Sequence, residues 1–305
     1  MGRILGVDLR IDGSWFVVAL LVVYSFFLQF TLVFPRLAAA AAIGMAVTAA
    51  LMFFGSVLVH ELAHALVARR RGIEVRGITL FLFGGATHAR VESKGPRDEF
   101  VVSAVGPVTS LGLAGVLAGL GLLLRTIAPR PVVGTLFLLA WLNLVLAIFN
   151  LIPGFPLDGG RLLRSALWAR WGSILRATRV AALAGQTVGY LLVATGIVMM
   201  VARRVGAGVW LAAIGWFLAQ AARTSFQELR TQRLLDGVAA GDLAGAGEPP
   251  PGSPRVSPES PAIAVAEALR DARVDAVSVG SDGESRGIVT RASLRAWIDA
   301  RAEAR

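Results

Sequence analysis

The stretch that decides the fold runs from residue 37 to residue 68 and reads LAAAAAIGMAVTAALMFFGSVLVHELAHALVA. It is long enough to cross a bilayer as one helix, which needs about 20 apolar residues. Near its end it nevertheless holds His60, Glu61 and His64 within five residues. Ionisable side chains are costly in an apolar span, and they usually mark a functional site. We therefore predict a membrane-spanning helix that carries a reactive centre close to one end.

The composition supports a membrane protein. Of the 305 residues, 55% are hydrophobic and only 16% are charged, and the mean hydropathy is +0.67. A soluble domain would need more polar surface than this. The absence of cysteine excludes disulfides and thiolate metal ligands. The net charge of +10 comes mostly from Arg residues at the ends of apolar segments, a pattern that fits membrane orientation better than nucleic-acid binding.

Six apolar segments are predicted to span the membrane, at residues 14–34, 37–68, 100–124, 131–151, 180–202 and 205–222. An even number of spans places both termini on one side. Up to residue 233, the segments on that side hold 17 Lys and Arg residues, and those on the other side hold five. Because positive residues concentrate on the inner face, both termini are expected in the cytoplasm.

The sequence HELAH predicts a zinc site on the second span. His60 and His64 are four residues apart, so a helix presents both imidazoles on one face. With Glu61 between them they form the H-E-x-x-H arrangement of zinc hydrolases, in which the histidines bind Zn²⁺ and the glutamate is the general base. The alternative is a histidine pair that only packs a helix interface.

A third ligand is expected in FNLIPGFPLDGGRLLRS, residues 149–165, because catalytic zinc needs three protein ligands. Pro153 and Pro156 break the fourth helix and place Asp158 on a turn. Its alternative role is the N-cap of a helix that starts near Arg161. The remaining histidine, His88, lies in a predicted hairpin and is a poor candidate ligand.

The two motifs are expected at the same depth in the membrane. At 1.5 Å per residue, residues 37–60 rise about 34 Å and residues 131–150 rise about 29 Å. Both segments start on the outer side of a hydrocarbon core about 30 Å thick. Both motifs should therefore reach its cytoplasmic end, where they can meet.

Two further segments are not membrane spans. Residues 72–93, GIEVRGITLFLFGGATHARVES, alternate in a way typical of a β-hairpin. This hairpin is either associated with the membrane or a cytoplasmic loop with two strands. Residues 240–260 are rich in Gly, Pro and Ser and predict a linker. Residues 261–300 then predict a helix, a strand, a turn at Asp282–Gly283, a second strand and a helix.

The paired motifs, in this order and setting, resemble the site-2 protease family of intramembrane zinc metalloproteases, in its bacterial and archaeal branch with six spans and a C-terminal CBS region. HELAHA resembles the family's zinc helix, and NLIPGFPLDGGRLLRS resembles its second motif. GRILGVDLRIDGSW at residues 2–15, GGATHA at 84–89 and AVGP at 104–107 are also similar to family patterns. The likeness covers roughly residues 2–225.

The resemblance implies roles for individual residues. His60, His64 and Asp158 would bind one Zn²⁺ per chain, with Glu61 as general base. Asn150 would contact the substrate backbone or the tetrahedral intermediate, unless it is only a capping or packing residue. Substrate would pair as an added strand with Gly84, Gly85 and Ala86. The substrates would be membrane-spanning proteins cut near the cytoplasmic face of a prokaryotic plasma membrane.

The expected fold is an all-α polytopic membrane protein with six transmembrane helices, a membrane-associated β-hairpin and a small α/β CBS-like C-terminal domain. The protease domain would cover residues 1–233, a linker or degraded first CBS motif 234–260, and a CBS-like regulatory region 261–305. That region implies a possible adenine nucleotide, although Ser293 stands where such repeats commonly carry an acid. Dimerisation or gating is the alternative role.

Three glycines of the third span, Gly112, Gly115 and Gly119, could form a homodimer seam, but close packing inside the bundle is the preferred interpretation. Two rival functions stay open. One is a metal-dependent transporter or sensor without proteolysis, although few polar residues lie along the spans to form a path. The other is a nucleotide-responsive binding module that the spans anchor in the membrane.

Overall fold

The computed structural model describes residues 2–4, 6–81, 84–89, 95–272, 274–281 and 284–303. Contacts between residues divide the chain into two units, Met1–Arg223 and Thr224–Arg305.

Within the described residues, six helices are long and apolar enough to cross a membrane: α1 (Gly13–Val33), α2 (Ala39–Arg70), α3 (Pro96–Leu124), α4 (Arg130–Asn150), α6 (Ile174–Val201) and α7 (Val205–Leu235). The six predicted spans are thus confirmed as helices. Their ends differ most in α6, which starts earlier than predicted, and in α7, which ends later, because helical turns that carry Arg extend the apolar runs. Large apolar side chains such as Leu20 and Leu32 are 70% and 80% exposed, as expected for surface that faces lipid.

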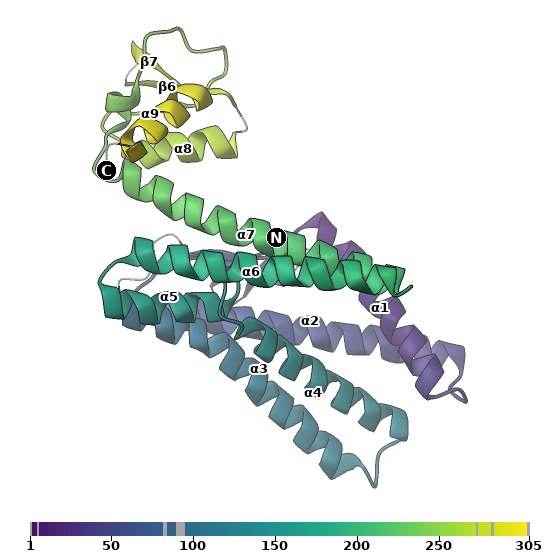
Figure 1. Ribbon diagram of the computed structural model, residues 1–305. Coiled ribbons are helices and arrows are strands. Elements are labelled where there is room, and N and C mark those ends of the chain that lie inside the picture. The colour runs from purple at the N-terminus through teal and green to yellow at the C-terminus, as the bar shows by residue number, and fades with distance from the viewer. Residues whose placement is uncertain are drawn as a thin grey trace. The chain divides into compact units, whose positions relative to one another are not determined.

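Helix α3 contacts α2, α4 and a further helix, α5 (Asp158–Trp171). Helix α5 packs in turn on α6 (Figure 1). It has 14 residues and is not among the candidate spans. It ends at Gly172, whose φ of 68° is the left-handed conformation that favours glycine. The loop of residues 151–157 joins α4 to α5 and delivers Asp158 to the bundle.

A four-stranded sheet lies in the order β1 (Gly2–Ile4), β2 (Val7–Ile11), β3 (Val75–Phe81) and β4 (Gly84–Ala89). Strand β2 is parallel to β3, and β3 is antiparallel to β4. Val7 and Ile78 of the sheet pack with Ala65 of α2. Strands β3 and β4 lie within residues 72–93, and residues 82–83 between them are outside the described part of the chain. Association of these strands with the membrane stays a prediction.

The second unit contains the last turns of α7, a short 3-10 helix (Ala240–Leu243), β5 (Arg255–Val256), α8 (Ala262–Asp271), β6 (Ala276–Ser281), β7 (Glu284–Thr290) and α9 (Arg291–Glu303). From α8 onward the elements follow the predicted order, with Asp282 and Gly283 outside the described residues. Val238, Ala240 and Leu243 join the core of this unit, so part of the stretch 234–260 is packed. Its CBS character and the predicted domain limits stay predictions.

The preferred interpretation of the glycines of α3 is wrong. Gly112, Gly115 and Gly119 are exposed, and a Cβ atom added to any of them would meet no atom within 4 Å. They lie on a face of α3 that its neighbours do not cover. Close packing within the bundle therefore does not explain them, and a homodimer seam there stays a prediction.

Candidate metal centre

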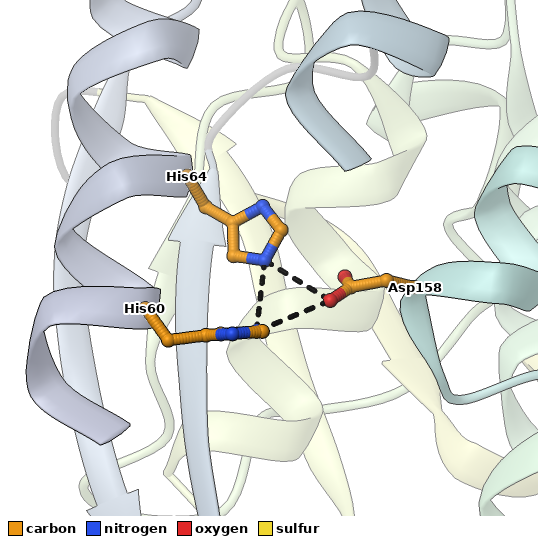
Figure 2. A group of neighbouring side chains, drawn as sticks. All are labelled: His60, His64 and Asp158. Atoms are coloured by element: carbon orange, nitrogen blue, oxygen red, sulfur yellow. Dashed lines mark hydrogen bonds and ion pairs between the residues drawn. The ribbon is translucent and has the colours of Figure 1, made fainter. Parts of the chain in front are cut away.

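Three side chains converge between α2 and α5. His60 and His64 project from successive turns of α2, and Asp158 faces them from the first turn of α5 (Figure 2). The Oδ2 atom of Asp158 lies 3.2 Å from Nε2 of His60 and 3.1 Å from Nε2 of His64. The two Nε2 atoms are 3.2 Å apart. Both histidines are buried, at 3% and 4% exposure.

The hydrogen bonds of the Nδ1 atoms indicate that the Nε2 atoms of the two histidines are available to bind a metal ion. Nδ1 of His64 lies 2.6 Å from the carbonyl oxygen of Val102. A carbonyl only accepts, so Nδ1 carries the proton and donates, and Nε2 of the neutral ring keeps its lone pair. Nδ1 of His60 is hydrogen-bonded to Ser110 Oγ at 2.9 Å, which lets its Nε2 face inward in the same way. Three electron-pair donors then face one another, an arrangement that a cation stabilises.

The donor set fits zinc. Zinc binds imidazole nitrogen at about 2.0–2.1 Å and carboxylate oxygen at about 2.0–2.2 Å, so tetrahedral neighbours lie about 3.3 Å apart. The observed separations of 3.1–3.2 Å match this value. Three protein ligands also leave a fourth position open, as in catalytic rather than structural zinc sites.

Helix α3 supplies no ligand, yet it shapes the centre. Val102, Gly106 and Ser110 lie on one face of it, four residues apart. A Cβ atom at Gly106 would lie 2.1 Å from His64 Nε2 and 2.7 Å from His60 Nε2. Only glycine therefore leaves room for the ligand atoms at this point.

Sequence reasoning missed Val102 and Ser110, and it quoted Gly106 only as part of AVGP. Val102 acts through its carbonyl group, which any residue carries, so no sequence signal marks it. Ser110 is a polar residue one turn from Gly106 in an apolar helix. That spacing could have marked it as a candidate hydrogen-bond partner.

Asp158 is held by closely packed backbone. Leu157 is the N-cap of α5, so the alternative role of Asp158 as the cap is wrong. A Cβ atom at Gly159 would lie 2.3 Å from the carbonyl oxygen of Ile152, so the start of α5 rests directly on the preceding loop. The Oδ2 atom of Asp158 faces the Nε2 atoms of both histidines at 3.1–3.2 Å. An ionised carboxylate at this position can serve as the third metal ligand.

The other predicted site residues are placed as follows. Glu61 is half-buried on α2, between the two histidines in sequence. Asn150 is the last residue of α4, and its Nδ2 donates to the carbonyl oxygen of Leu146 at 2.9 Å. Residues 84–86 begin β4 and are paired with residues 81, 80 and 79 of β3.

Comparisons with known proteins agree with this geometry. The family model described as Peptidase family M50 matches residues 48–134 and 125–195. The chain is 34% identical over 308 residues to "Putative zinc metalloprotease sll0528" of Synechocystis sp., covering 97% of this chain and 76% of that protein. It is 46% identical over 194 residues to "Putative zinc metalloprotease Rip3" of Mycobacterium tuberculosis, covering 63% of this chain and 49% of that protein. The chain thus spans about half the length of the Rip3 protein.

A solved structure described as "Site-2 Protease from Methanocaldococcus jannaschii" superimposes with a TM-score of 0.54 at 25% identity. The match covers 74% of this chain and 94% of that chain. Six spanning helices and these similarities identify an integral membrane protein. On the strength of the near full-length relative, the family model and the histidine–aspartate centre, the chain belongs to peptidase family M50, the site-2 protease family.

Proposed function

We propose that the chain is an intramembrane zinc metalloprotease that hydrolyses peptide bonds of membrane-spanning proteins near the cytoplasmic face. One observation carries the proposal: two histidine nitrogens and one aspartate oxygen, from helices far apart in sequence, lie within 4.8 Å of one another in an apolar bundle. Glu61 is next to His60 on the same helix. The relatives named as zinc metalloproteases support this chemistry.

His60, His64 and Asp158 would hold the ion, and a zinc ion there would acidify water and polarise the scissile carbonyl. Glu61 takes the proton from the attacking water and delivers it to the leaving amine. Asn150 at the end of α4 releases its bond to Leu146 and donates its amide to the substrate carbonyl oxygen as negative charge develops there. The surrounding apolar helices restrict bulk water and so strengthen these interactions.

Strand β4 is the proposed docking edge for substrate. Within the described residues it pairs with β3 on one side and has no strand on the other. The far edge of β3 is covered by β2. A transmembrane helix must unwind before cleavage, and its freed N–H and C=O groups then need partners. The small residues Gly84, Gly85 and Ala86 would let the unwound segment approach closely.

The distribution of Lys and Arg residues supports an orientation in the membrane. Up to residue 233, the 17 Lys and Arg residues of one side against five of the other support cytoplasmic termini. The bacterial and archaeal sources of the similar proteins support residence in a prokaryotic plasma membrane. The metal centre lies near the end of α2 whose last turn carries Arg69 and Arg70, and these positive charges support a position toward the cytoplasmic side. Cleavage would therefore occur near that face.

The test is the Glu61→Gln substitution in the full chain, reconstituted with single-span reporter proteins. We expect peptide cleavage to be abolished while one zinc per chain is retained, measured by mass spectrometry of peptides and by metal analysis. Glu228→Gln, at an exposed carboxylate of the second unit, is the matched control and should cleave normally. Retained cleavage by Glu61→Gln, or zinc flux into vesicles without any cleavage, would contradict the proposal.

The substrate can be sought with the same variant. Expressed in cells, Glu61→Gln should retain bound single-span proteins that it cannot cut. Mass spectrometry of the proteins that co-purify with it, compared with the active chain, would identify them.

A further inference from the structure

A buried ion pair joins α3 to α5. Glu99, in the first turn of α3, is completely buried. Nε of Arg164 on α5 donates to Glu99 Oε1 at 2.6 Å, and Nη2 of Arg164 contacts the same oxygen. The Arg164 side chain is only 13% exposed. Arg161 is a more distant neighbour, with Nε 3.9 Å from the same oxygen.

Stability alone is a weak explanation for this pair. The cost of removing two charges from water often equals or exceeds their attraction, and buried pairs can be replaced by apolar residues with little loss. Their better attested use is to fix one arrangement among several. We therefore expect Glu99 and Arg164 to fix the position of α5 relative to α3.

Arg164 follows Asp158 on α5 and also contacts the loop that precedes Asp158. It lies on α5 six residues after Asp158, less than two helical turns away. Its guanidinium also lies over the ring of Phe155, 5.1 Å from the ring centre. Phe155 belongs to the loop that leads into Asp158. A single side chain therefore ties together the loop and the helix that present the third ligand.

Helix α3 therefore helps to position all three ligands. It holds the ring of His60 through Ser110 and that of His64 through Val102. Through Glu99 and Arg164 it also fixes α5. Among the described residues, the contacts of Glu99 with Arg164 and Arg161 are the polar links between α3 and the helix that carries Asp158.

We propose that Glu99 and Arg164 are positioning residues that hold Asp158 at bonding distance from the shared metal of His60 and His64. This inference rests on the proposed function, because it concerns the ion of that same site. It assigns no contact with substrate to either residue.

The first measurement is zinc affinity of the detergent-solubilised full chain, by competition with a chelator. Glu99→Gln and Arg164→Gln should each weaken zinc binding about ten- to a hundredfold, the range seen when partners of metal ligands are lost. Asp98→Asn is the matched control, because Asp98 is adjacent in sequence and its salt bridge goes to Arg71 of the α2–β3 turn rather than to α5. It should leave the affinity unchanged. Equal affinities in all four proteins would overturn the inference.

A single variant leaves one charge buried without its partner and can fail to fold. The double variant Glu99→Gln/Arg164→Gln removes both charges and keeps similar volume, so it isolates positioning from misfolding. With Co²⁺ in place of zinc, its visible absorption should shift toward that of Asp158→Ala, since both lose the carboxylate ligand. A spectrum identical to that of the unaltered chain would overturn the inference.

A double-mutant cycle separates positioning from a general effect on the fold. If the pair acts through Asp158, adding Glu99→Gln/Arg164→Gln to Asp158→Ala should not weaken zinc binding further. If Glu99→Gln/Arg164→Gln weakens zinc binding by the same factor with and without Asp158, the pair supports only the fold and the inference is wrong.

A metal-free measurement distinguishes this inference from the proposed function. The chain has no cysteine, so His64→Cys and Asp158→Cys can be joined by a short bifunctional thiol reagent. The cross-link should form readily, and several-fold more slowly with Glu99→Gln/Arg164→Gln present. Absence of zinc binding by the unaltered chain would refute the proposed function, whereas an unchanged cross-linking rate would refute the positioning role.

Discussion

At the level of single residues, the carbonyl of Val102 and the hydroxyl of Ser110 hold the two imidazoles by their Nδ1 atoms. The orientation of both rings, and the proton position on His64, are thereby set before any ion binds. Partners of this kind are as much a part of a metal site as the ligands themselves, because they fix the tautomer and raise ligand basicity.

The first prediction concerns Ser110. Ser110→Ala should weaken zinc binding about tenfold, because His60 loses the partner that orients its ring. Ser103→Ala is a close control: Ser103 is buried on the same helix, and its hydroxyl has no hydrogen-bond partner in the described part of the chain. Chelator competition should show no change for that variant. Ser110→Thr, which keeps the hydroxyl, should restore most of the affinity.

The second prediction concerns Gly106. Gly106→Ala should abolish zinc binding, since the added Cβ atom would lie within 2.7 Å of both ligand nitrogens. Gly112→Ala adds the same atom to the same helix where nothing lies within 4 Å. It should bind zinc normally and raise helix stability by up to about 1 kcal/mol. Metal analysis and thermal unfolding of the two proteins would decide, and zinc bound by Gly106→Ala would contradict the geometry.

At the level of elements, the loop of residues 151–157 is wedged against α6. Phe155 N–H donates to the carbonyl oxygen of Ala181 at 3.1 Å, and a Cβ atom at Gly185 would lie 2.0 Å from the carbonyl oxygen of Phe155. Helix α6 therefore supports the loop that leads into Asp158.

The third prediction compares two glycines of α6. Gly185→Ala should displace the loop and weaken zinc binding at least tenfold, as the loss of support for a ligand does. Gly196→Ala should clash instead with Gly208 of α7, whose carbonyl oxygen would lie 2.6 Å from the new atom. Both variants should unfold at lower temperature, but only Gly185→Ala should also lose zinc affinity. Equal loss of affinity in both would argue against a specific supporting role for α6.

Much of the site could be predicted from the sequence because its signals are local. The spacing of His60 and His64 fixes a shared helix face, and the prolines before Asp158 mark a break. The role of α3 could not be predicted. Its contacts with the histidines reach across 38 and 50 residues, and one of them uses a backbone atom. The start of α5 was expected near Arg161, because sequence alone did not show that Leu157 would cap it.

At the level of the whole molecule, the ligands join two distant parts of the first unit. Zinc bound by α2 and α5 should therefore stabilise that unit and not the second, Thr224–Arg305. With zinc at about 100 times its dissociation constant the gain is about 2.7 kcal/mol. Calorimetry with and without a chelator should show one transition that moves and one that does not. Identical curves would mean that the ion does not bridge these helices.

The last prediction concerns orientation. Because the chain has no cysteine, single substitutions give a clean labelling background. Ala169→Cys, near the end of α5, should react with a membrane-impermeant thiol reagent only in inside-out vesicles. Thr126→Cys, between α3 and α4, should react in intact cells. Both residues are exposed, so the reverse pattern would place the termini outside.

The hydrogen bonds between α2 and α3 also restrict how a substrate enters. If these two helices moved apart, both imidazoles would lose the partners that aim them, and Gly106 would leave the contact that only it permits. Helices α2 and α3 must therefore stay in contact, and substrate does not enter between them. A polypeptide that enters laterally from the bilayer has to pass between other helices. An inhibitor that separated α2 from α3 would inactivate the metal centre without contacting any of the three ligands.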